Sequence, residues 1–229
     1  GLTDAIENPS RIDGLFIERA MVRASDMLAI LSAEAPINQP MMTDGGAFYQ
    51  LLEEFRQAFE CSIIDLPRNM LIQHTHLMTD VNVAVVVTEL SLAAARDTIR
   101  ILSWLKSNAP QARILVVANR VHPGAPEISR KDFEQSIERK VDVIVPFDLR
   151  IAAQAAKLGK TLAETAKGSK VGAACTAMMD EVLGLAGDEA DNPGAKSTAR
   201  KGDSLLGKIG DFKSMIPSRR KDKATALEG

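Results

Sequence analysis

An aspartate near the end of a short apolar run is the first candidate for chemistry in this chain. Residues 61–66 (CSIIDL) contain Asp65 and are followed by Pro67 and Arg68. An apolar, β-branched run ended by proline predicts a strand buried on both faces, with Asp65 at the carboxyl edge of a parallel sheet. Ligands bind at that edge in open α/β folds. A carboxylate there can hold a metal-bound water, orient a nucleophile or accept a phosphoryl group. Alternatively, Asp65 only caps the following turn.

Polar residues also follow three later apolar runs. These endings are Thr88-Glu89, Asn119-Arg120 and Pro146-Phe147-Asp148, after the runs at 81–88, 112–118 and 141–145. Because the carboxyl ends of parallel strands share one edge, we expect all the endings to form one rim. Each also has a purely structural explanation: Asn119 caps a turn, Arg120 is a surface charge, and Asp148 caps the helix that follows it.

The elements that position these residues alternate along the chain. Apolar runs predict strands at 27–32, 61–66, 81–88, 112–118 and 141–145. Helical spacing and capping residues predict helices at 45–60, 72–79, 91–106, 129–140, 149–158 and 170–185. Strands without polar alternation, separated by helices, indicate a three-layer α/β/α fold with a mainly parallel sheet.

Composition predicts one globular domain and a tail. The chain has 229 residues, of which 45% are apolar, which is enough for one substantial core. Cys61 and Cys175 lack metal-ligand spacing and lie in apolar surroundings, so we expect two buried thiols in a reducing, cytoplasmic compartment. No apolar stretch is long enough to span a bilayer, and no signal peptide is evident. His74 and His76 are expected to face solvent without binding a metal.

The carboxyl-terminal tail differs in charge from the rest of the chain. Residues 196–229 hold nine basic and four acidic side chains, a net charge of +5, against −7 for residues 1–195. Residues 187–200 are a polar linker, so the expected units are 1–186, 187–200 and 201–229. In the tail, apolar residues recur at helical spacing among the basic ones. A basic amphipathic helix suits an anionic membrane surface, through residues 201–223, or an acidic groove on a partner. A solubilising tail without a partner is the alternative.

The strand endings, taken together, resemble those of the deviant-Walker ATPases of the MinD/ParA class. Further motifs resemble the CpaE/TadZ pilus-assembly branch of that class over residues 1–185. They are Ile6-Glu7-Asn8-Pro9-Ser10-Arg11-Ile12-Asp13, Phe16-Ile17-Glu18-Arg19-Ala20, Leu31-Ser32-Ala33-Glu34, Ile64-Asp65-Leu66-Pro67-Arg68 and Val145-Pro146-Phe147-Asp148.

This resemblance implies a P-loop NTPase fold, with ATP and Mg²⁺ as cofactors of the intact protein. By the class pattern, Asp65 is the catalytic residue and positions Mg²⁺ through water. Asn119 faces adenine, Arg120 lies in the same cofactor-binding region, and the loop of Pro146 and Phe147 lies against the base. It also implies a factor that localises or regulates the Flp (type IVc) pilus machine. The expected partners are the pilus secretion ATPase, other pilus assembly proteins and a second copy of the chain. The expected location is the cytoplasmic side of the inner membrane or a cell pole.

One departure from the class concerns the phosphate-binding loop. Members carry a Gly-rich loop with Lys near their first strand, because backbone N–H groups and a cation must surround the phosphates. Gly159-Lys160-Thr161 is not that loop: Gln154 stands where the pattern needs glycine, and the tripeptide follows a helix. We therefore expect a domain truncated at its amino-terminal end, which is inactive alone.

Two other functions stay open on sequence grounds. The first is a degenerate, non-hydrolysing scaffold of the same fold. The second is a receiver-type phosphoacceptor domain built on Asp65 and Thr88. Against the receiver domain, the position expected for its lysine holds Asn119 and Arg120. Nucleic acid is not an expected partner, since the body is acidic and the basic tail lacks interleaved aromatic residues.

Overall fold

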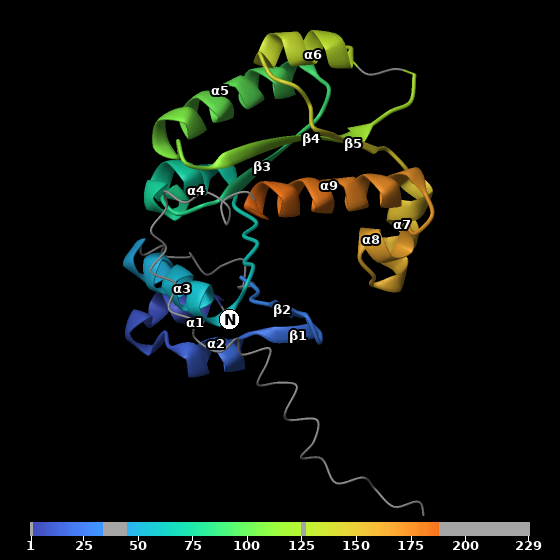
Figure 1. Cartoon of the computed structure of the whole chain (residues 1–229). Coiled ribbons are helices and arrows are strands. Elements are labelled where there is room, and N and C mark those ends of the chain that lie inside the picture. Colours follow the sequence, from blue (N-terminus) through green and yellow to red (C-terminus); the bar gives the residue numbers. More distant parts are fainter. Residues whose placement is uncertain (1, 34–44, 125–126, 188–229) are drawn as a thin grey trace, which may run out of the picture.

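The centre of the molecule is a parallel sheet of three strands in the order β3-β4-β5 (Figure 1). The computed structural model describes residues 2–33, 45–124 and 127–187. The strands are β3 (Val83–Thr88), β4 (Arg113–Val121) and β5 (Val143–Pro146). Three of the five predicted strands are thus confirmed, and β4 continues three residues further than predicted.

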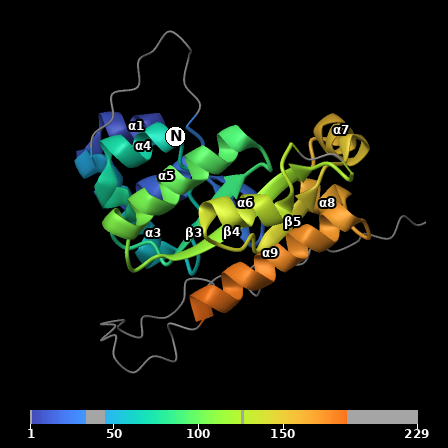
Figure 2. The same ribbon diagram turned by 90° about the horizontal axis from the view of Figure 1, so that it is seen from above.

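Helices cover both faces of this sheet, which confirms the three-layer α/β/α prediction (Figures 1 and 2). On one face, α5 (Leu92–Asn108) and α6 (Arg130–Ile137) pack on Val116 and Ala118 of β4. On the other face, α9 (Lys170–Gly187) packs on the alternate residues of β4 and β5. Burial on both faces explains why these strands lack polar alternation in the sequence.

Local capping residues set several helix boundaries as predicted. Ser91 accepts a hydrogen bond from Ala94 N–H (3.2 Å) at the start of α5, and Asp148 accepts one from Ile151 N–H (2.9 Å) at the start of α7 (Leu149–Leu158). Gly159, with φ of 59°, ends α7 in the left-handed conformation that glycine adopts without steric cost. The helix α8 (Leu162–Thr165) was not predicted.

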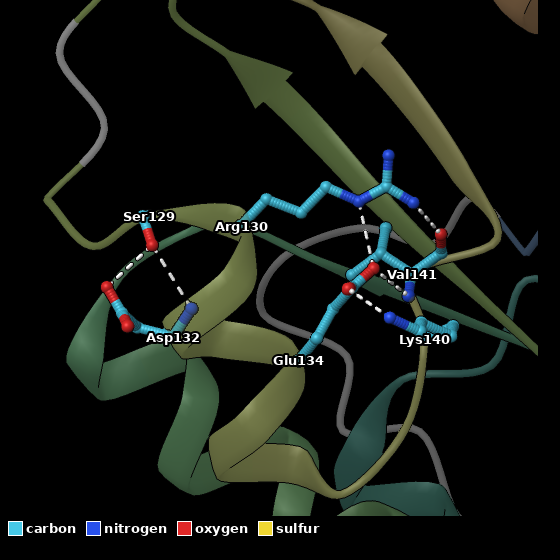
Figure 3. Close-up of polar contacts among 6 residues, drawn as sticks. All are labelled: Ser129, Arg130, Asp132, Glu134, Lys140 and Val141. Carbon is cyan, nitrogen blue, oxygen red and sulfur yellow. Dashed lines mark hydrogen bonds and ion pairs between the residues drawn. The ribbon is translucent and has the colours of Figure 1, made fainter.

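A polar network joins α6 to the start of β5 (Figure 3). The Glu134 carboxylate accepts hydrogen bonds from Val141 N–H (3.0 Å), Arg130 Nε (2.8 Å) and Lys140 Nζ (3.3 Å). The Arg130 guanidinium also donates to the Val141 carbonyl (2.7 Å). The Val141 N–H bond and then Arg130 lower the pKa of Glu134 from 4.5 to about 2, because both stabilise the ionised carboxylate.

The amino-terminal part forms a second group of elements below the sheet in Figure 1. Its helices are α1 (Leu2–Glu7), η1 (Pro9–Arg11), α2 (Gly14–Ala20), α3 (Gly45–Ala58), α4 (Arg68–Gln73) and η2 (Thr75–Met78). The run predicted as a strand at 27–32 is β2 (Leu28–Ile30), which pairs antiparallel with β1 (Val22–Ser25). It therefore lies in a separate hairpin and not in the parallel sheet.

The predicted strand at 61–66 is wrong. No secondary structure is assigned to these residues, and Ile63 is 91% exposed. A strand needs a neighbour for its backbone N–H and C=O groups, and within the described ranges the parallel sheet ends at β3. The expectation for Cys61 fails for the same reason, because its thiol is exposed, whereas Cys175, a residue of α9 itself, is half-buried against the core.

The prediction that His74 and His76 face solvent is also wrong. His74 is 8% exposed and its ring packs on Phe48, with ring centroids 5.3 Å apart. The Nε2 atoms of both histidines are buried, and neither has a hydrogen-bond partner in the described structure. The sequence misled because polar residues in a loop were taken to be exposed, whereas here the loop packs on α3. No group of three metal-ligating side chains occurs among the described residues.

Candidate functional site

A pocket of about 410 Å³ lies at the carboxyl edge of β3 and β4, next to the first turns of α5. Thr88 and Glu89 reach it from the end of β3, and Asn119 and Arg120 reach it from β4. Other lining residues come from helices: Arg68, Ala94, Asp97, Thr98 and Ile101. The structure therefore brings together two of the four polar endings that the sequence placed on one rim.

Asn119 and Arg120 lie in an irregular stretch of β4. The pairing of β4 with β5 shifts register between Ala118 and Val121, and Arg120 has a φ of 54°. The Asn119 Oδ1 atom accepts a hydrogen bond from Arg120 N–H (2.9 Å). This local bond supports the left-handed backbone of Arg120, which is uncommon for a residue other than glycine. The irregularity directs both residues to the pocket beside β3.

Two ion pairs neutralise the arginines of the pocket. Arg68 Nη1 lies 3.0 Å from Asp97 Oδ2, and Arg120 Nη1 lies 3.5 Å from Glu89 Oε1. All four side chains are about half exposed or more, so each pair is screened by water and contributes little to stability. The pocket is thus polar but nearly balanced in charge.

The buried side of the pocket carries two hydroxyl groups. Thr88 Oγ1 and Thr98 Oγ1 lie 2.8 Å apart, and both residues are buried. Thr88 comes from the end of β3 and Thr98 from the middle of α5, so this bond ties the helix to the strand beside the pocket. A buried hydroxyl needs a partner, and each of these provides one for the other.

The remaining predicted site residues lie outside the pocket. Pro146 pairs with Val121 at the end of β5, and Phe147 N–H donates to the Val121 carbonyl (2.9 Å). The Phe147 ring stacks on His122, with centroids 4.2 Å apart and the planes inclined by 26°. These residues are next to Asn119 and Arg120 along the sheet but do not line the same cavity.

Asp65 is exposed and is not among the residues that line the pocket. Its neighbour Leu66 packs against the cluster of Ile6, Phe48 and Leu77, and Pro67 precedes the first turn of α4. The receiver-type alternative requires Asp65 and Thr88 in one site, and the structure places only Thr88 in the pocket. Arg68, three residues after Asp65 and the first residue of α4, does line the pocket.

Sequence reasoning gave no role to Arg68, Asp97, Thr98 or His122. Arg68 was visible in the quoted Asp-Leu-Pro-Arg run, but nothing in the sequence indicated its partner 29 positions later. Asp97 and Thr98 lie on α5. The sequence pattern of that helix predicts only that its polar residues face solvent. His122 directly follows the strand end, so its position at the rim was predictable, whereas its stacking on Phe147 was not.

Solved structures identify the fold. MinD from Pyrococcus horikoshii OT3, in complex with Mg-ADP, matches with a TM-score of 0.67 over 84% of this chain and 76% of that one, at 18% identity. Pyrococcus furiosus MinD matches with a TM-score of 0.66 over 80% and 75%, at 19% identity. A ParA family ATPase from Chlorobium tepidum TLS gives 0.60 over 76% and 71%, at 18% identity. The chain has the MinD/ParA fold.

Sequence comparison gives a partial match to a curated protein. An alignment of 84 positions, which covers 34% of the chain, shows 34% identity to the ESX-1 secretion-associated protein EspI of Mycobacterium tuberculosis, in strains CDC 1551 / Oshkosh and ATCC 25618 / H37Rv. The match spans only 13% of the length of EspI. No protein-family model matches the chain.

The described residues of the pocket fit the base of a nucleotide better than its phosphates. An amide and paired hydroxyls line the pocket, and such groups suit a neutral, planar, hydrogen-bonding ligand such as a nucleobase. Among the described lining residues none is a glycine, and both arginines are paired with carboxylates. The described lining therefore shows neither a Gly-rich loop nor an unpaired cation to bind phosphates. In the described ranges, no helix is long and apolar enough to cross a membrane.

Proposed function

We propose that the chain is part of an ATP-binding MinD/ParA-like protein of the CpaE/TadZ type, which localises or regulates a pilus secretion machine. The observation that carries this proposal is the pocket at the carboxyl edge of β3 and β4 in a MinD/ParA fold. In this proposal Asn119 binds the adenine, with Arg120 beside it. Pro146 and Phe147 frame the base from the next strand end, and the exposed Asp65 holds Mg²⁺ through water.

Two features support a missing partner strand within the same protein. Residues 61–66 have a strand-like sequence but no neighbour, and β3 has no strand on its outer edge in the described part of the chain. Val87 is 61% exposed, and its register with Val117 places it on the sheet face that α9 covers elsewhere. In the proposal, an amino-terminal segment with the phosphate loop adds a strand here and brings Asp65 to the site.

The proposed cellular role follows from the CpaE/TadZ resemblance. Nucleotide state would control homodimerisation and docking to the pilus secretion ATPase on the cytoplasmic side of the membrane or at a cell pole. EspI, which matches part of the chain, is an ESX-1 secretion-associated protein, and this association supports a role beside a secretion machine. In this class, ATP is hydrolysed by water to ADP and phosphate, and the conformation of the protein depends on which nucleotide is bound.

A non-hydrolysing scaffold of the same fold is the second candidate. It is favoured by the two ion pairs of the pocket, since Glu89 and Asp97 already neutralise the arginines that an anionic ligand would need. In that case the pocket either binds a neutral ligand or none, and the protein acts only by binding its partners.

Calorimetry of ATP binding with and without Mg²⁺ separates the two candidates. It is made on the 229-residue chain and on the longer protein that carries the proposed phosphate loop. We expect Mg²⁺-dependent binding only in the longer protein. There, Asp65→Ala should remove the Mg²⁺ dependence, and Asn119→Ala should reduce the preference for ATP over GTP. Asp26→Ala, at an exposed aspartate between β1 and β2, is the control. If the longer protein does not bind ATP, the non-hydrolysing scaffold is the candidate that remains.

A further inference from the structure

The last two turns of α9 carry an exposed apolar and acidic surface. Met179 and Leu183 are 53% and 58% exposed, and residues four apart lie side by side on a helix. Asp180 and Glu181 line a surface hollow of about 350 Å³ together with Gly184 and Leu185. Leu185 also packs towards the core, so we call the other five residues, Met179, Asp180, Glu181, Leu183 and Gly184, the α9 outer surface. The opposite side of α9 packs on the sheet through Ala174, Met178 and Val182.

We propose that the basic amphipathic segment at residues 201–216 of the same chain docks on the α9 outer surface. Its apolar residues have the spacing of one helix face: Leu205, Ile209, Phe212 and Ile216. A second set, Lys201, Lys208 and Lys213, provides the charge that Asp180 and Glu181 attract. Apolar residues of the segment contact Met179 and Leu183, and its lysines face the two carboxylates.

Charge favours the basic tail, rather than a second copy of the α9 outer surface, as the group that docks there. Residues 180–191 contain five acidic and no basic side chains, whereas residues 201–223 contain seven basic and three acidic ones. Two copies of the acidic surface would repel each other, so a homodimer through α9 is disfavoured. The body as a whole carries a net charge of −7 and the tail +5, which attracts the tail to the body.

Chain length allows the segment to return to α9. Thirteen residues, 188–200, separate the end of α9 from the segment. A polar linker of that length has an end-to-end distance of about 20 Å, whereas the nine residues from Met179 to Gly187 span about 12 Å of helix. Because the two partners are in one chain, their effective concentration is on the order of millimolar, so weak contacts suffice.

This docking makes α9 and an external surface compete for the same residues. A helix that buries Ile209 and Phe212 against α9 cannot place them in a lipid surface or in a groove of a partner at the same time. The tail is then withheld until a stronger ligand displaces it. The inference concerns α9 and the tail only and does not depend on nucleotide binding.

Hydrogen–deuterium exchange of the full chain tests the proposal. We expect amides of residues 203–216 to exchange at least about tenfold more slowly than in a synthetic peptide of residues 201–223. Leu183→Glu and Phe212→Glu should each remove that protection. Leu158→Glu should not, because Leu158 is 54% exposed at the end of α7 and is a matched exposed leucine near a helix end. Leu183 and Leu158 are both exposed, and circular dichroism checks that each variant is folded.

Other outcomes overturn the proposal. They are rapid exchange of residues 203–216 in the unmodified chain, or protection that survives Leu183→Glu. Protection that appears only when protein concentration rises would assign the surface to a second copy. Protection that appears only with vesicles of phosphatidylglycerol and phosphatidylcholine, with no change at residues 178–186, would assign the tail to the membrane.

Discussion

The hydroxyl groups of Thr88 and Thr98 lie 2.8 Å apart and join the end of β3 to the middle of α5 beside the pocket. Thr88 has one further acceptor, the Glu89 carbonyl at the long distance of 3.5 Å, so the threonine pair is its main contact. Because Thr98 is 2% exposed, its hydroxyl has little access to water. The pair therefore fixes the position of α5 relative to the strand end that forms the pocket.

Replacing one of these hydroxyls should cost more than replacing both. We expect Thr98→Val to lower the free energy of unfolding by about 1–3 kcal/mol, because it leaves the buried Thr88 hydroxyl without its main partner. The double variant Thr88→Val, Thr98→Val should recover most of that loss, since two apolar groups of the same shape replace the pair. Urea denaturation of the three proteins measures this. Additive losses in the double variant would contradict it.

Two glycines of α9 should respond to alanine in opposite directions. A Cβ at Gly172 would lie 2.2 Å from the Ala166 carbonyl oxygen, and Ala166 is fully buried. Backbone must move to accept it, so Gly172→Ala should destabilise the protein by about 1–3 kcal/mol or more. A Cβ at Gly184 meets nothing within 4 Å, and Gly184→Ala should stabilise by about 1 kcal/mol through helix propensity. Thermal or denaturant unfolding measures both, and equal effects would refute the contact at Gly172.

Features set by neighbouring residues in the chain were predicted best from the sequence. Ser91 and Asp148 begin helices as expected, since an N-cap bonds to a backbone N–H only two or three positions away. The three parallel strands were also predicted, because their apolar runs show burial on both faces. Residues 61–66 show the same pattern but form no strand, and residues 61–65 are exposed, because a strand also needs a neighbour and pairing is not encoded in the run itself.

The site was predicted only where its residues lie at the carboxyl ends of strands. Asn119 and Thr88 meet in one pocket because β3 and β4 are parallel neighbours in register. Arg68 and Asp97 could not be paired from sequence, since their 3.0 Å contact depends on how α4 packs beside α5. Pro146 and Phe147 follow a strand one position further along the sheet, so they lie beside the pocket without lining it.

The two cysteines should react at different rates with a thiol reagent. Cys61 is exposed and follows α3 in a stretch without secondary structure, whereas Cys175, a residue of α9, is half-buried and packs on the core. In the native chain we expect one fast-reacting thiol, which Cys61→Ser removes and Cys175→Ser retains. Labelling with Ellman's reagent, before and after denaturation, measures this. Two fast thiols would show that Cys175 of α9 is not packed against the core. If the longer protein adds a strand beside residues 61–66, Cys61 should react more slowly there.

The Glu134 network should make stability depend on pH in an acidic range. Hydrogen bonds from Val141 N–H and Arg130 lower the pKa of Glu134 from 4.5 to about 2 in the folded chain (Figure 3). The unfolded chain therefore binds a proton more readily, so the contribution of Glu134 is complete above pH 4.5 and is lost as the pH falls from 4.5 towards 2. Glu134→Gln should remove this part of the pH dependence, so that its stability deficit is largest above pH 4.5 and small near pH 2.

Denaturant unfolding at several pH values between 2 and 7 measures the difference between Glu134→Gln and the unmodified chain. Lys140→Gln is the matched control, because Lys140 contributes less to the shift than Val141 N–H and Arg130 do. That variant should keep most of the dependence on pH between 4.5 and 2. A deficit of Glu134→Gln that is the same at pH 2.5 and pH 6 would show that the loss comes from packing and not from the ionised carboxylate. A loss of pH dependence in Lys140→Gln as large as in Glu134→Gln would instead assign the stabilisation of the carboxylate to the Lys140 ion pair.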